Sequence, residues 1–331
     1  MSERVTIVGD GAMATVCSLL LSQGGHSVTL WGVFEESINR LIQNRENQRL
    51  LPGVRLPRNV QLTANDAECF KGCTLILSAV PTQYMRSVWK RLAQHVPVGV
   101  PIISVAKGIE NHTLLRPTQI IMELVGRGRG LAALSGPNIA AELARYLPAT
   151  AVAATEDAQL AQRIQNVFST QWFRVYTNSD VIGTELAGAT KNVIAIAAGI
   201  LDGLAAGNNA KAALVTRGLV EITRLGVAMG AQELTFQGLA GLGDLITTCV
   251  SPEGRNRTVG EQVGKGRKLQ DILGSMDSVA EGVPTTRSVR ELSIRYNVEM
   301  PITEAVHAVL FEGMDVIRAL TTLMTREAKA E

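Results

Sequence analysis

The segment Val5-Thr6-Ile7-Val8-Gly9-Asp10-Gly11-Ala12-Met13-Ala14, close to the start of the chain, predicts how the N-terminal half folds. Its first four residues are mostly β-branched, which is typical of a buried parallel strand. Gly9, Gly11 and Ala14 then follow the pattern G-x-G-x-x-A, and 15–21 is expected to form a helix. In this strand–turn–helix context Gly9 permits a tight turn, and Gly11 lets a pyrophosphate approach the helix N-terminus. The segment therefore indicates a dinucleotide-binding unit, and a glycine-rich turn without a ligand is the alternative.

Strand-like and helix-like segments continue to alternate after this unit. Further strands are expected at 27–31, 74–80, 101–106, 131–134, 149–154 and 172–176. Such alternation predicts a Rossmann-like, doubly wound, mostly parallel α/β sheet.

The strand pattern stops near residue 180. Helical spacing then appears at 180–204, 210–229, 285–297 and 302–312. The chain has 331 residues, more than one hydrophobic core usually serves. We therefore expect a dinucleotide-binding domain at 1–180 and an all-α substrate and catalytic domain at 181–331.

Composition excludes several classes of partner. The net charge is +2 and aromatic residues make up only 4% of the chain, so neither a nucleic acid nor a membrane surface is expected as a partner. Cys69 and Cys73 form the only close cysteine pair, and no histidine is placed to complete a metal site with them. The chain runs from Met1 into a strand without an apolar signal region, which predicts a cytoplasmic protein. A helical second domain often mediates dimerisation, so a homodimer is one assembly that the sequence allows.

Lys191 stands alone among small apolar residues in the segment 186–200. Burial disfavours the charged form of an amine, so this ammonium is expected either to be paired or to have a lowered pKa. A desolvated lysine can exchange a proton near neutral pH. The alternative is a lysine that reaches water from a core helix.

Three further candidates follow predicted strands. Lys107 lies just past the strand at 101–106, and Gly136 and Asn138 follow the strand at 131–134. Ligands of open α/β sheets bind outside these carboxyl ends, which favours a binding role for Lys107 over an exposed loop lysine. Gly136 is expected where a backbone approaches a ligand closely, and Asn138 is expected to cap the next helix.

Two polar segments interrupt the helical half. Three glycines within Gly238–Leu245 are poor helix formers, so we expect an unusual backbone there that ends in the carboxylate of Asp244. Asp244 is a candidate partner of Lys191, a ligand of a substrate hydroxyl, or a helix N-cap. In the second segment, Gly254 to Arg257, guanidinium and amide groups suit a phosphate, and a solvated basic turn is the alternative.

The coenzyme preference stays open at this stage. An enzyme specific for NAD often has an acidic residue at the end of the second strand, but the chain has Gly32-Val33-Phe34 there. NADP favours a nearby arginine, for which Arg45 and Arg49 are candidates although they lie further along the chain. We expect NAD or NADP.

Eight short sequence motifs occur one after another along the chain. They are 9–14 (GDGAMA), 105–108 (VAKG), 134–137 (LSGP), 189–195 (ATKNVIA), 240–245 (AGLGDL), 255–257 (RNR), 279–282 (VAEG) and 300–303 (MPIT). With these motifs the chain resembles the bacterial type of NAD(P)-dependent glycerol-3-phosphate dehydrogenase over nearly all of its length. The resemblance implies reversible hydride transfer between NAD(P)H and dihydroxyacetone phosphate, which gives sn-glycerol 3-phosphate for glycerophospholipid synthesis.

The resemblance also implies roles for individual residues. It makes Lys191 the proton acceptor and places Lys107 against both substrate and coenzyme. The implied substrate contacts are Lys107, Gly136, Asn138, Lys191, Asp244, Gly254, Arg255 and Asn256. The implied coenzyme contacts, added to Gly9 and Gly11 of the glycine turn, are Ala12, Met13, Val33, Lys107, Ala140, Arg255, Val279 and Glu281.

Two other functions stay open. One is a related two-domain dehydrogenase that acts on a β-hydroxyacid or a ketopantoate-like acid, because arginine binds carboxylates as well as phosphates. The other is a non-catalytic sensor that binds a dinucleotide without turnover.

Overall fold

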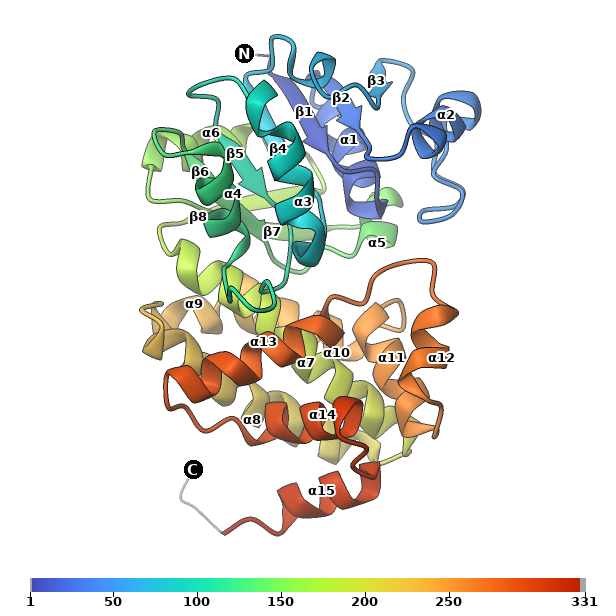
Figure 1. Ribbon diagram of the computed structural model, residues 1–331, viewed down its shortest axis with the longest axis vertical. Helices are drawn as coiled ribbons and strands as arrows, with labels where there is room; N and C mark the ends of the chain where they lie inside the picture. The colour runs from blue at the N-terminus through green and yellow to red at the C-terminus, as the bar shows by residue number, and fades with distance from the viewer. Residues whose placement is uncertain (1, 328–331) are drawn as a thin grey trace.

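The computed structural model describes residues 2–327, which form a sheet domain above a helical domain in the view of Figure 1. The strands are β1 (Arg4–Val8), β2 (Ser27–Trp31), β3 (Val60–Thr63), β4 (Leu75–Ser78), β5 (Ile102–Ser104), β6 (Leu131–Ser135), β7 (Ala149–Ala154) and β8 (Phe173–Asn178). The helices between them are α1 (Ala12–Gln23), α2 (Glu35–Asn44), α3 (Thr82–Leu92), α4 (Pro117–Val125), α5 (Ala140–Ala144) and α6 (Ala158–Phe168).

All eight strands form one sheet in the order β3-β2-β1-β4-β5-β6-β7-β8. Every neighbouring pair is parallel except β6 and β7. The predicted doubly wound, mostly parallel sheet is therefore confirmed. Strand β3 was not predicted from the sequence, and it pairs in parallel with β2 at the sheet edge.

Hydrophobic residues cover both faces of the sheet. One cluster joins the strands to α1 and α6, and it includes Leu20 and Ile164. A second cluster joins the opposite face to α3 and α4, where Trp89 and Ile120 are fully buried. Because helices cover both faces, a ligand reaches the sheet only at the strand ends.

The rest of the described chain is helical. Its helices are α7 (Val181–Gly203), α8 (Gly207–Ala228), α9 (Glu233–Gln237), α10 (Asp244–Val250), α11 (Arg255–Gly264), α12 (Leu269–Gly274), α13 (Gly282–Arg295), α14 (Pro301–Phe311) and α15 (Val316–Met324). A π-helical segment, η3 (Leu239–Gly243), precedes α10.

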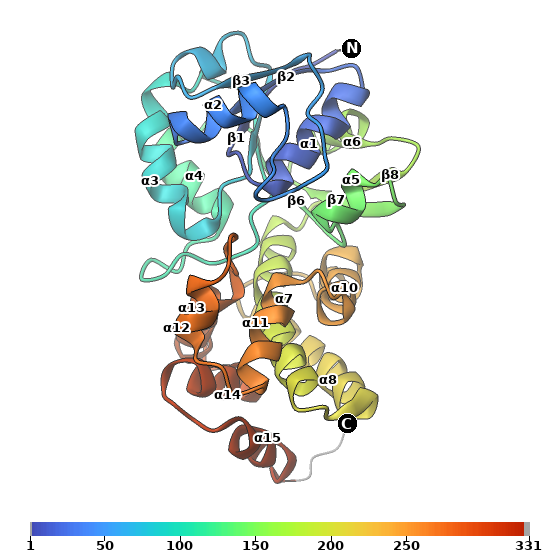
Figure 2. The same ribbon diagram turned by 90° about the vertical axis from the view of Figure 1, so that its right-hand side faces the viewer.

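Helix α7 runs from the sheet domain down the middle of the helical domain (Figure 2). Of the described helices it alone is long and apolar enough to cross a bilayer, and 89% of its most apolar window is buried inside the protein. The other helices of the domain pack around it, so α7 has the burial of a core helix.

Glycines bring α7 and α11 into backbone contact. A Cβ atom on Gly199 of α7 would overlap the carbonyl oxygen of Arg257, and one on Gly260 of α11 would overlap that of Ile196. The small residues of α7 therefore have a packing cause, because only glycine lets two helix backbones approach this closely.

Buried carboxylates tie other helices to this core. Glu221 of α8 accepts hydrogen bonds of 2.8 Å from the backbone N–H groups of Ile302 and Thr303 and one of 2.7 Å from the Thr303 hydroxyl. Glu185 of α7 likewise accepts from Thr118 at the start of α4 and pairs with Arg116. Each carboxylate satisfies free donors at a helix N-terminus, where negative charge is favoured.

Candidate active site

Lys191 lies in the middle of α7 with 5% of its surface exposed. Its Nζ atom donates to Asp244 Oδ1 at 2.7 Å and to the hydroxyl of Thr248. Burial lowers the pKa of Lys191 to about 8; the Asp244 carboxylate opposes this shift, and the neighbouring Lys107 adds to it. The amine is both paired and easily deprotonated, which excludes the alternative of a lysine that reaches bulk water.

Asp244 owes its position to the unusual backbone that precedes it. The π-helical turn Leu239–Gly243 lies so close to α9 that a Cβ atom on Gly241 would overlap the backbone of Phe236. The wide turn ends at α10, whose first residue is Asp244. The N-cap of α10 is Gly243, so the interpretation of Asp244 as an N-cap is wrong, whereas its pairing with Lys191 is confirmed.

Lys107 approaches the same carboxylate from the sheet domain. Its Nζ atom donates to Asp244 Oδ2 at 2.8 Å, to the carbonyl oxygen of Gly136 at 2.9 Å and to Asn138 Oδ1 at 2.8 Å. The carbonyl oxygen of Lys107 accepts from the amide of Asn192 on α7. Asp244 thus lies between two ammonium groups, one from each half of the chain.

Gly136 and Asn138 lie at the end of β6, as expected. Gly136 has φ +135°, and a Cβ atom there would lie 3.0 Å from the Cα atom of Ala151 on β7. Asn138 is not a helix cap, because α5 begins at Ala140 and its N-cap is Ile139. The side-chain oxygen of Asn138 accepts instead from Lys107, which explains why it is unavailable to the helix.

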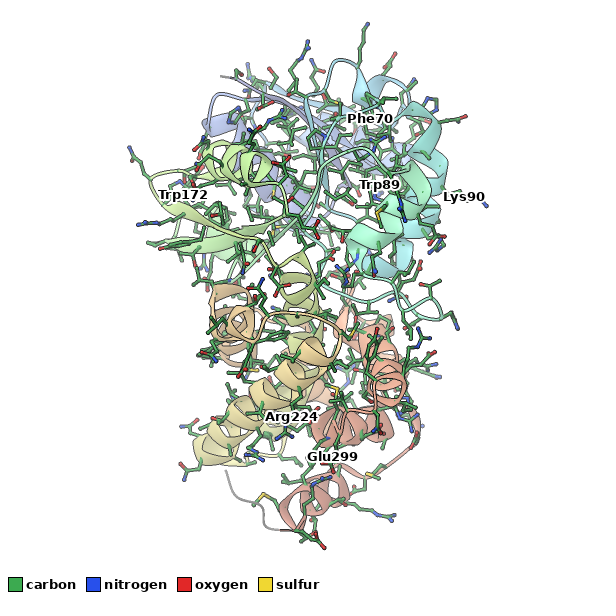
Figure 3. The ribbon with its side chains drawn as sticks, turned by 90° about the vertical axis from the view of Figure 1, so that its left-hand side faces the viewer. Phe70, Trp89, Lys90, Trp172, Arg224 and Glu299 are labelled. Carbon is green, nitrogen blue, oxygen red and sulfur yellow. The ribbon has the colours of Figure 1, made fainter. Side chains whose placement is uncertain are left out.

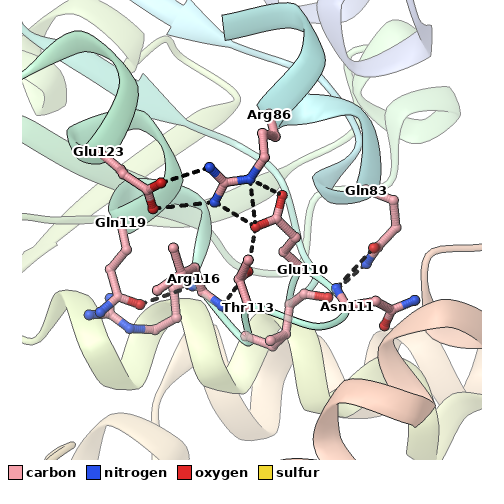
Figure 4. A network of polar contacts seen from close by, with 10 residues as sticks. Gln83, Arg86, Glu110, Asn111, Thr113, Arg116, Gln119 and Glu123 are labelled. Carbon is pink, nitrogen blue, oxygen red and sulfur yellow. Dashed lines mark hydrogen bonds and ion pairs between the residues drawn. The ribbon is translucent and has the colours of Figure 1, made fainter. Parts of the chain in front are cut away.

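The chain beyond Lys107 is held by a polar network (Figure 4). Arg86 of α3 donates to Glu110 and Glu123, and Gln83 donates to the carbonyl oxygen of Ile109. The hydroxyl of Ser288 on α13 also donates to Ile109. This network fixes the backbone that follows Lys107 and connects it to the helical domain.

Gly254, Arg255 and Asn256 form the start of α11, with Gly254 as its N-cap, so the alternative of a solvated basic turn is wrong. Asn256 is buried, and its Oδ1 atom accepts from the backbone N–H of Gly282 at 2.9 Å. Arg255 is exposed and forms no ion pair with any residue between 2 and 327. Arg257 Nε lies 2.6 Å from Asp202 Oδ2 in an ion pair. Of these two arginines, Arg255 is therefore the one whose guanidinium can bind an anion.

The glycine turn after β1 leaves open space beside the N-terminus of α1. Gly9 has φ +121°, and a Cβ atom there would lie 2.7 Å from the carbonyl oxygen of Ala79 after β4. Gly11 is the N-cap of α1, and no atom lies within 4 Å of where its Cβ would be. Ala12 and Met13 form the partly exposed first turn of α1. The N–H groups of this turn therefore suit a pyrophosphate.

No acidic residue stands directly at the end of β2, where the chain reads Gly32-Val33-Phe34 before Glu35 opens α2. Val33 follows β2, and its carbonyl oxygen accepts from Arg91 of α3. Arg45 donates from Nη2 to the carbonyl oxygens of Pro57 and Val60, so its guanidinium is held against the segment before β3. Arg49 pairs with Asp277 of the helical domain.

The other implied coenzyme contacts lie at the junction of the domains. Ala140 is the first residue of α5. Val279 and Glu281 precede α13, and Glu281 Oε1 accepts from the backbone N–H of Thr82 at the start of α3, at 2.8 Å. Glu281 therefore connects the helical domain to the sheet domain, because its carboxylate accepts from a backbone N–H that α3 leaves without a partner in the helix.

Some functional neighbours were not predicted. Thr248 follows Asp244 by four residues on α10, and this i, i+4 spacing was the only available signal that both face Lys191. Asn192 had no distinguishing pattern. Asn47 donates to the carbonyl oxygen of Asp10 in the glycine turn, a contact that sequence spacing cannot show.

The structure therefore joins Lys191, Asp244, Lys107, Gly136 and Asn138 directly by hydrogen bonds. Asn256 is connected to the coenzyme-side loop through Gly282, whereas no hydrogen bond joins Arg255 to the lysines within residues 2–327. Within the same residues no three His, Cys, Asp or Glu side chains gather as a metal site.

Comparison with known proteins places this site in context. Residues 4–161 match the model for the NAD-dependent glycerol-3-phosphate dehydrogenase N-terminus, and residues 180–321 match that for the C-terminus. The chain is 47% identical to glycerol-3-phosphate dehydrogenase [NAD(P)+] of Citrifermentans bemidjiense, covering 100% of this chain and 99% of that protein. It is 45% identical to the protein of that name in Bacillus pumilus, covering 98% and 94%.

A solved structure is also similar. Glycerol-3-phosphate dehydrogenase from Coxiella burnetii superposes with a TM-score of 0.95 at 34% identity, over 98% of this chain and 99% of that chain. The similarity therefore extends over both domains and their arrangement.

Proposed function

The chain belongs to the NAD-dependent glycerol-3-phosphate dehydrogenase family, and we propose that the paired lysines and Asp244 carry out the reaction of that family. The chain is an NAD(P)-dependent oxidoreductase that acts on a small phosphate-bearing substrate. It transfers a hydride reversibly between NAD(P)H and dihydroxyacetone phosphate, giving sn-glycerol 3-phosphate for glycerophospholipid synthesis. The observation that carries the site assignment is the buried Lys191 amine with its lowered pKa.

The coenzyme supplies the hydride when it is bound. Gly11, Ala12 and Met13 would hold its pyrophosphate through free N–H groups at the start of α1, and Gly9, whose N–H donates to the carbonyl oxygen of Trp31, would shape the turn beside it. Because Gly11 has open space beside its Cα, a phosphate can approach the backbone there. Val33, Ala140, Val279 and Glu281 are proposed to line the remainder of the coenzyme site.

Lys191 acts on the proton. During reduction its ammonium donates a proton to the carbonyl oxygen of the substrate, and beforehand it stabilises the negative charge that develops there. During oxidation the neutral amine takes the hydroxyl proton. Asp244 and Thr248 hold the amine in place while the low dielectric keeps its pKa near neutrality.

Lys107 has a second role at the same carboxylate. Its charge compensates Asp244 when Lys191 becomes neutral, and it keeps Gly136 and Asn138 close to the reacting carbon. We propose that this ammonium contacts both substrate and coenzyme, because it lies at the strand ends where the domains meet.

Arg255 and Asn256 are proposed to bind the phosphate of the substrate. Arg255 is an unpaired guanidinium at a helix N-terminus, where anions are favoured. Asn256 uses its oxygen for Gly282, which leaves its amide N–H groups as donors. The N–H of Gly254 donates to the carbonyl oxygen of Ser251, so the N–H groups that follow it in the first turn of α11 complete the phosphate site, whose binding energy positions the reacting carbon.

Initial rates measured with dihydroxyacetone phosphate, and with NADH and NADPH in parallel, test this proposal. A β-hydroxyacid or ketopantoate-like dehydrogenase would instead prefer the corresponding keto acids in the same absorbance assay. A dinucleotide sensor would bind coenzyme without turnover with any substrate of the panel. Faster turnover of a keto acid than of dihydroxyacetone phosphate would contradict the substrate assignment.

The assembly and location of the chain are separate proposals. We propose a cytoplasmic protein, without a nucleic-acid or membrane partner, whose helical domain mediates a homodimer, and a domain boundary near residue 180. Light scattering of the purified protein tests the dimer, and a separately expressed fragment 1–180 that binds coenzyme would support the boundary.

A further inference from the structure

Two exposed ion pairs connect the domains on either side of the site. Arg49 pairs with Asp277, and Arg145 pairs with Glu253. In both pairs the arginine belongs to the sheet domain and the carboxylate belongs to a loop of the helical domain. Each of these loops leads directly into residues that we assign to ligand binding.

The first pair lies on the coenzyme side. Arg49 Nε lies 3.2 Å from Asp277 Oδ1, and Arg49 Nη2 donates to the carbonyl oxygen of Asp277 at 2.9 Å. Arg49 follows Asn47, which bonds to the glycine turn. The segment between α12 and α13, which contains Asp277, rises from the helical domain toward the sheet domain in both Figure 1 and Figure 2. It continues to Glu281, which bonds to the start of α3.

The second pair lies on the substrate side. Arg145 Nη2 lies 3.1 Å from Glu253 Oε1. Arg145 directly follows α5, and Glu253 directly precedes Gly254 and the phosphate-binding start of α11. This pair therefore fixes the loop from which Gly254 and Arg255 extend.

Both pairs form only when the two domains are together. An exposed pair of this kind favours the arrangement that contains it by about two- to fivefold. An effect of this size is too small to hold the domains together, because the buried contacts of Lys107 with Asp244 do that. It is large enough to change how often one loop is in its binding position, and so to change one apparent affinity.

We infer that Arg49–Asp277 and Arg145–Glu253 are separate clasps, the first holding the coenzyme loop and the second holding the substrate phosphate loop. Their four side chains are positioning residues: they act on the ligands through Val279 and Glu281 in one case and through Gly254 and Arg255 in the other. This inference rests on the proposed function.

The test measures the KM for coenzyme and the KM for dihydroxyacetone phosphate separately. Arg49→Gln and Asp277→Asn should each raise the KM for coenzyme two- to fivefold and change the KM for dihydroxyacetone phosphate less than that. Arg145→Gln and Glu253→Gln should produce the opposite selectivity. Each double variant should be no worse than its single variants. The exchanged pair Arg49→Asp with Asp277→Arg should recover part of the loss, because it restores the ion pair but not the bond from residue 49 to the carbonyl oxygen of residue 277.

A matched control removes an exposed pair that lies within one helix. Arg295 and Glu291 are both 54% exposed and pair at 3.8 Å on α13, so Arg295→Gln should leave both KM values unchanged. Asp277→Asn keeps the bond from Arg49 to the carbonyl oxygen of residue 277, so it should raise the KM for coenzyme less than Arg49→Gln does. No rise at all with Asp277→Asn would show that the ion pair does not hold the coenzyme loop, which would overturn the first clasp. Equal changes in both KM values, or none, would overturn the selectivity of the clasps.

Coenzyme Kd values from calorimetry, measured without substrate, keep this test separate from the proposed function. A wild-type protein that does not turn over dihydroxyacetone phosphate contradicts the proposed function, yet a rise in coenzyme Kd common to Arg49→Gln and Asp277→Asn still supports the first clasp.

Discussion

Lys191 Nζ lies 2.7 Å from Asp244 Oδ1, and both side chains are almost completely removed from solvent. The second oxygen of the same carboxylate is held by Lys107 at 2.8 Å. One negative charge therefore serves two positive charges, so the pair can lose one proton without leaving the carboxylate unpaired. Burial is the main cause of the lowered pKa of Lys191; the charge of Lys107 adds to this shift, and Asp244 opposes it.

The two directions of the reaction should depend on pH in opposite ways. Reduction needs the ammonium form of Lys191, which exists below its pKa of about 8, so kcat for reduction should fall as pH rises through that value. Oxidation needs the neutral amine, so its kcat should rise over the same range. Rates of both reactions between pH 6 and 10 check this, and parallel profiles would contradict the assignment of Lys191.

Replacement of Lys191 should remove turnover and spare coenzyme binding. Lys191→Ala is expected to lower kcat by about 10²–10⁴, the usual contribution of a positioned acid or base. The Kd for coenzyme should change little, because Lys191 is not among the residues that we propose to hold the coenzyme. Steady-state kinetics gives kcat, and calorimetry on the same preparation gives the Kd for coenzyme. Near-normal turnover in Lys191→Ala would mean that another group moves the proton.

Replacement of Arg255 should act mainly on substrate affinity. A charge-assisted hydrogen bond contributes about 1.5–3 kcal/mol, so Arg255→Ala should raise the KM for dihydroxyacetone phosphate by about 10- to 100-fold. Arg224→Ala is the matched control, since Arg224 is exposed on α8, well away from the sheet domain in Figure 3. Inorganic phosphate should inhibit the wild type competitively and inhibit Arg255→Ala much more weakly. An unchanged KM would place the phosphate elsewhere.

Glu221 should matter for stability and not for chemistry. Glu221→Ala leaves two backbone N–H groups at the start of α14 without their acceptor, which should lower the free energy of unfolding by about 3 kcal/mol. Glu221→Gln retains an acceptor oxygen and should cost less. Urea unfolding measures both variants, while kcat of the folded fraction should stay at the wild-type value.

The helix contact between α7 and α11 should not tolerate a methyl group. Gly260→Ala would drive its Cβ into the carbonyl oxygen of Ile196, so the helices must separate and the melting temperature should fall by several degrees. Gly274→Ala is the control, because no atom lies within 4 Å of its Cβ position at the end of α12. A Gly260→Ala protein with wild-type stability would show that this contact is not tight.

Local sequence pattern accounts for much of the fold. The β-branched run before Gly9 and the glycines after it predicted the first strand, turn and helix, because those features depend on neighbouring residues. Strand β3 was missed since its four residues include a polar Gln61 and gain their position from β2. The antiparallel direction of β7 likewise depends on a neighbour, β6, which no local pattern shows.

In the site, too, features that depend on neighbouring residues could be predicted, and features that depend on distant residues could not. A lone lysine among small apolar residues raised the expectation of a paired amine or a lowered pKa and left a lysine that reaches water as the alternative; the structure shows Lys191 buried, paired and with a lowered pKa. Asn138 was misassigned as a cap because the capping preference is local, whereas its actual partner, Lys107, is 31 residues away. For Arg255 and Asn256 the sequence left a solvated basic turn as the alternative, but helix α11 begins there because the rest of that segment packs on α7.

The glycine contact of α7 with α11 has a consequence for which ketones the protein accepts. Lys191 projects from one of these helices and Arg255 begins the other, so the span between proton donor and phosphate grip is set by two main chains in contact. Side-chain changes away from this contact leave the helix spacing unchanged, whereas a methyl group at Gly260 would separate the helices. A phosphorylated ketone with one more carbon would require one helix to slide along the other, so discrimination by chain length is a property of the backbone itself.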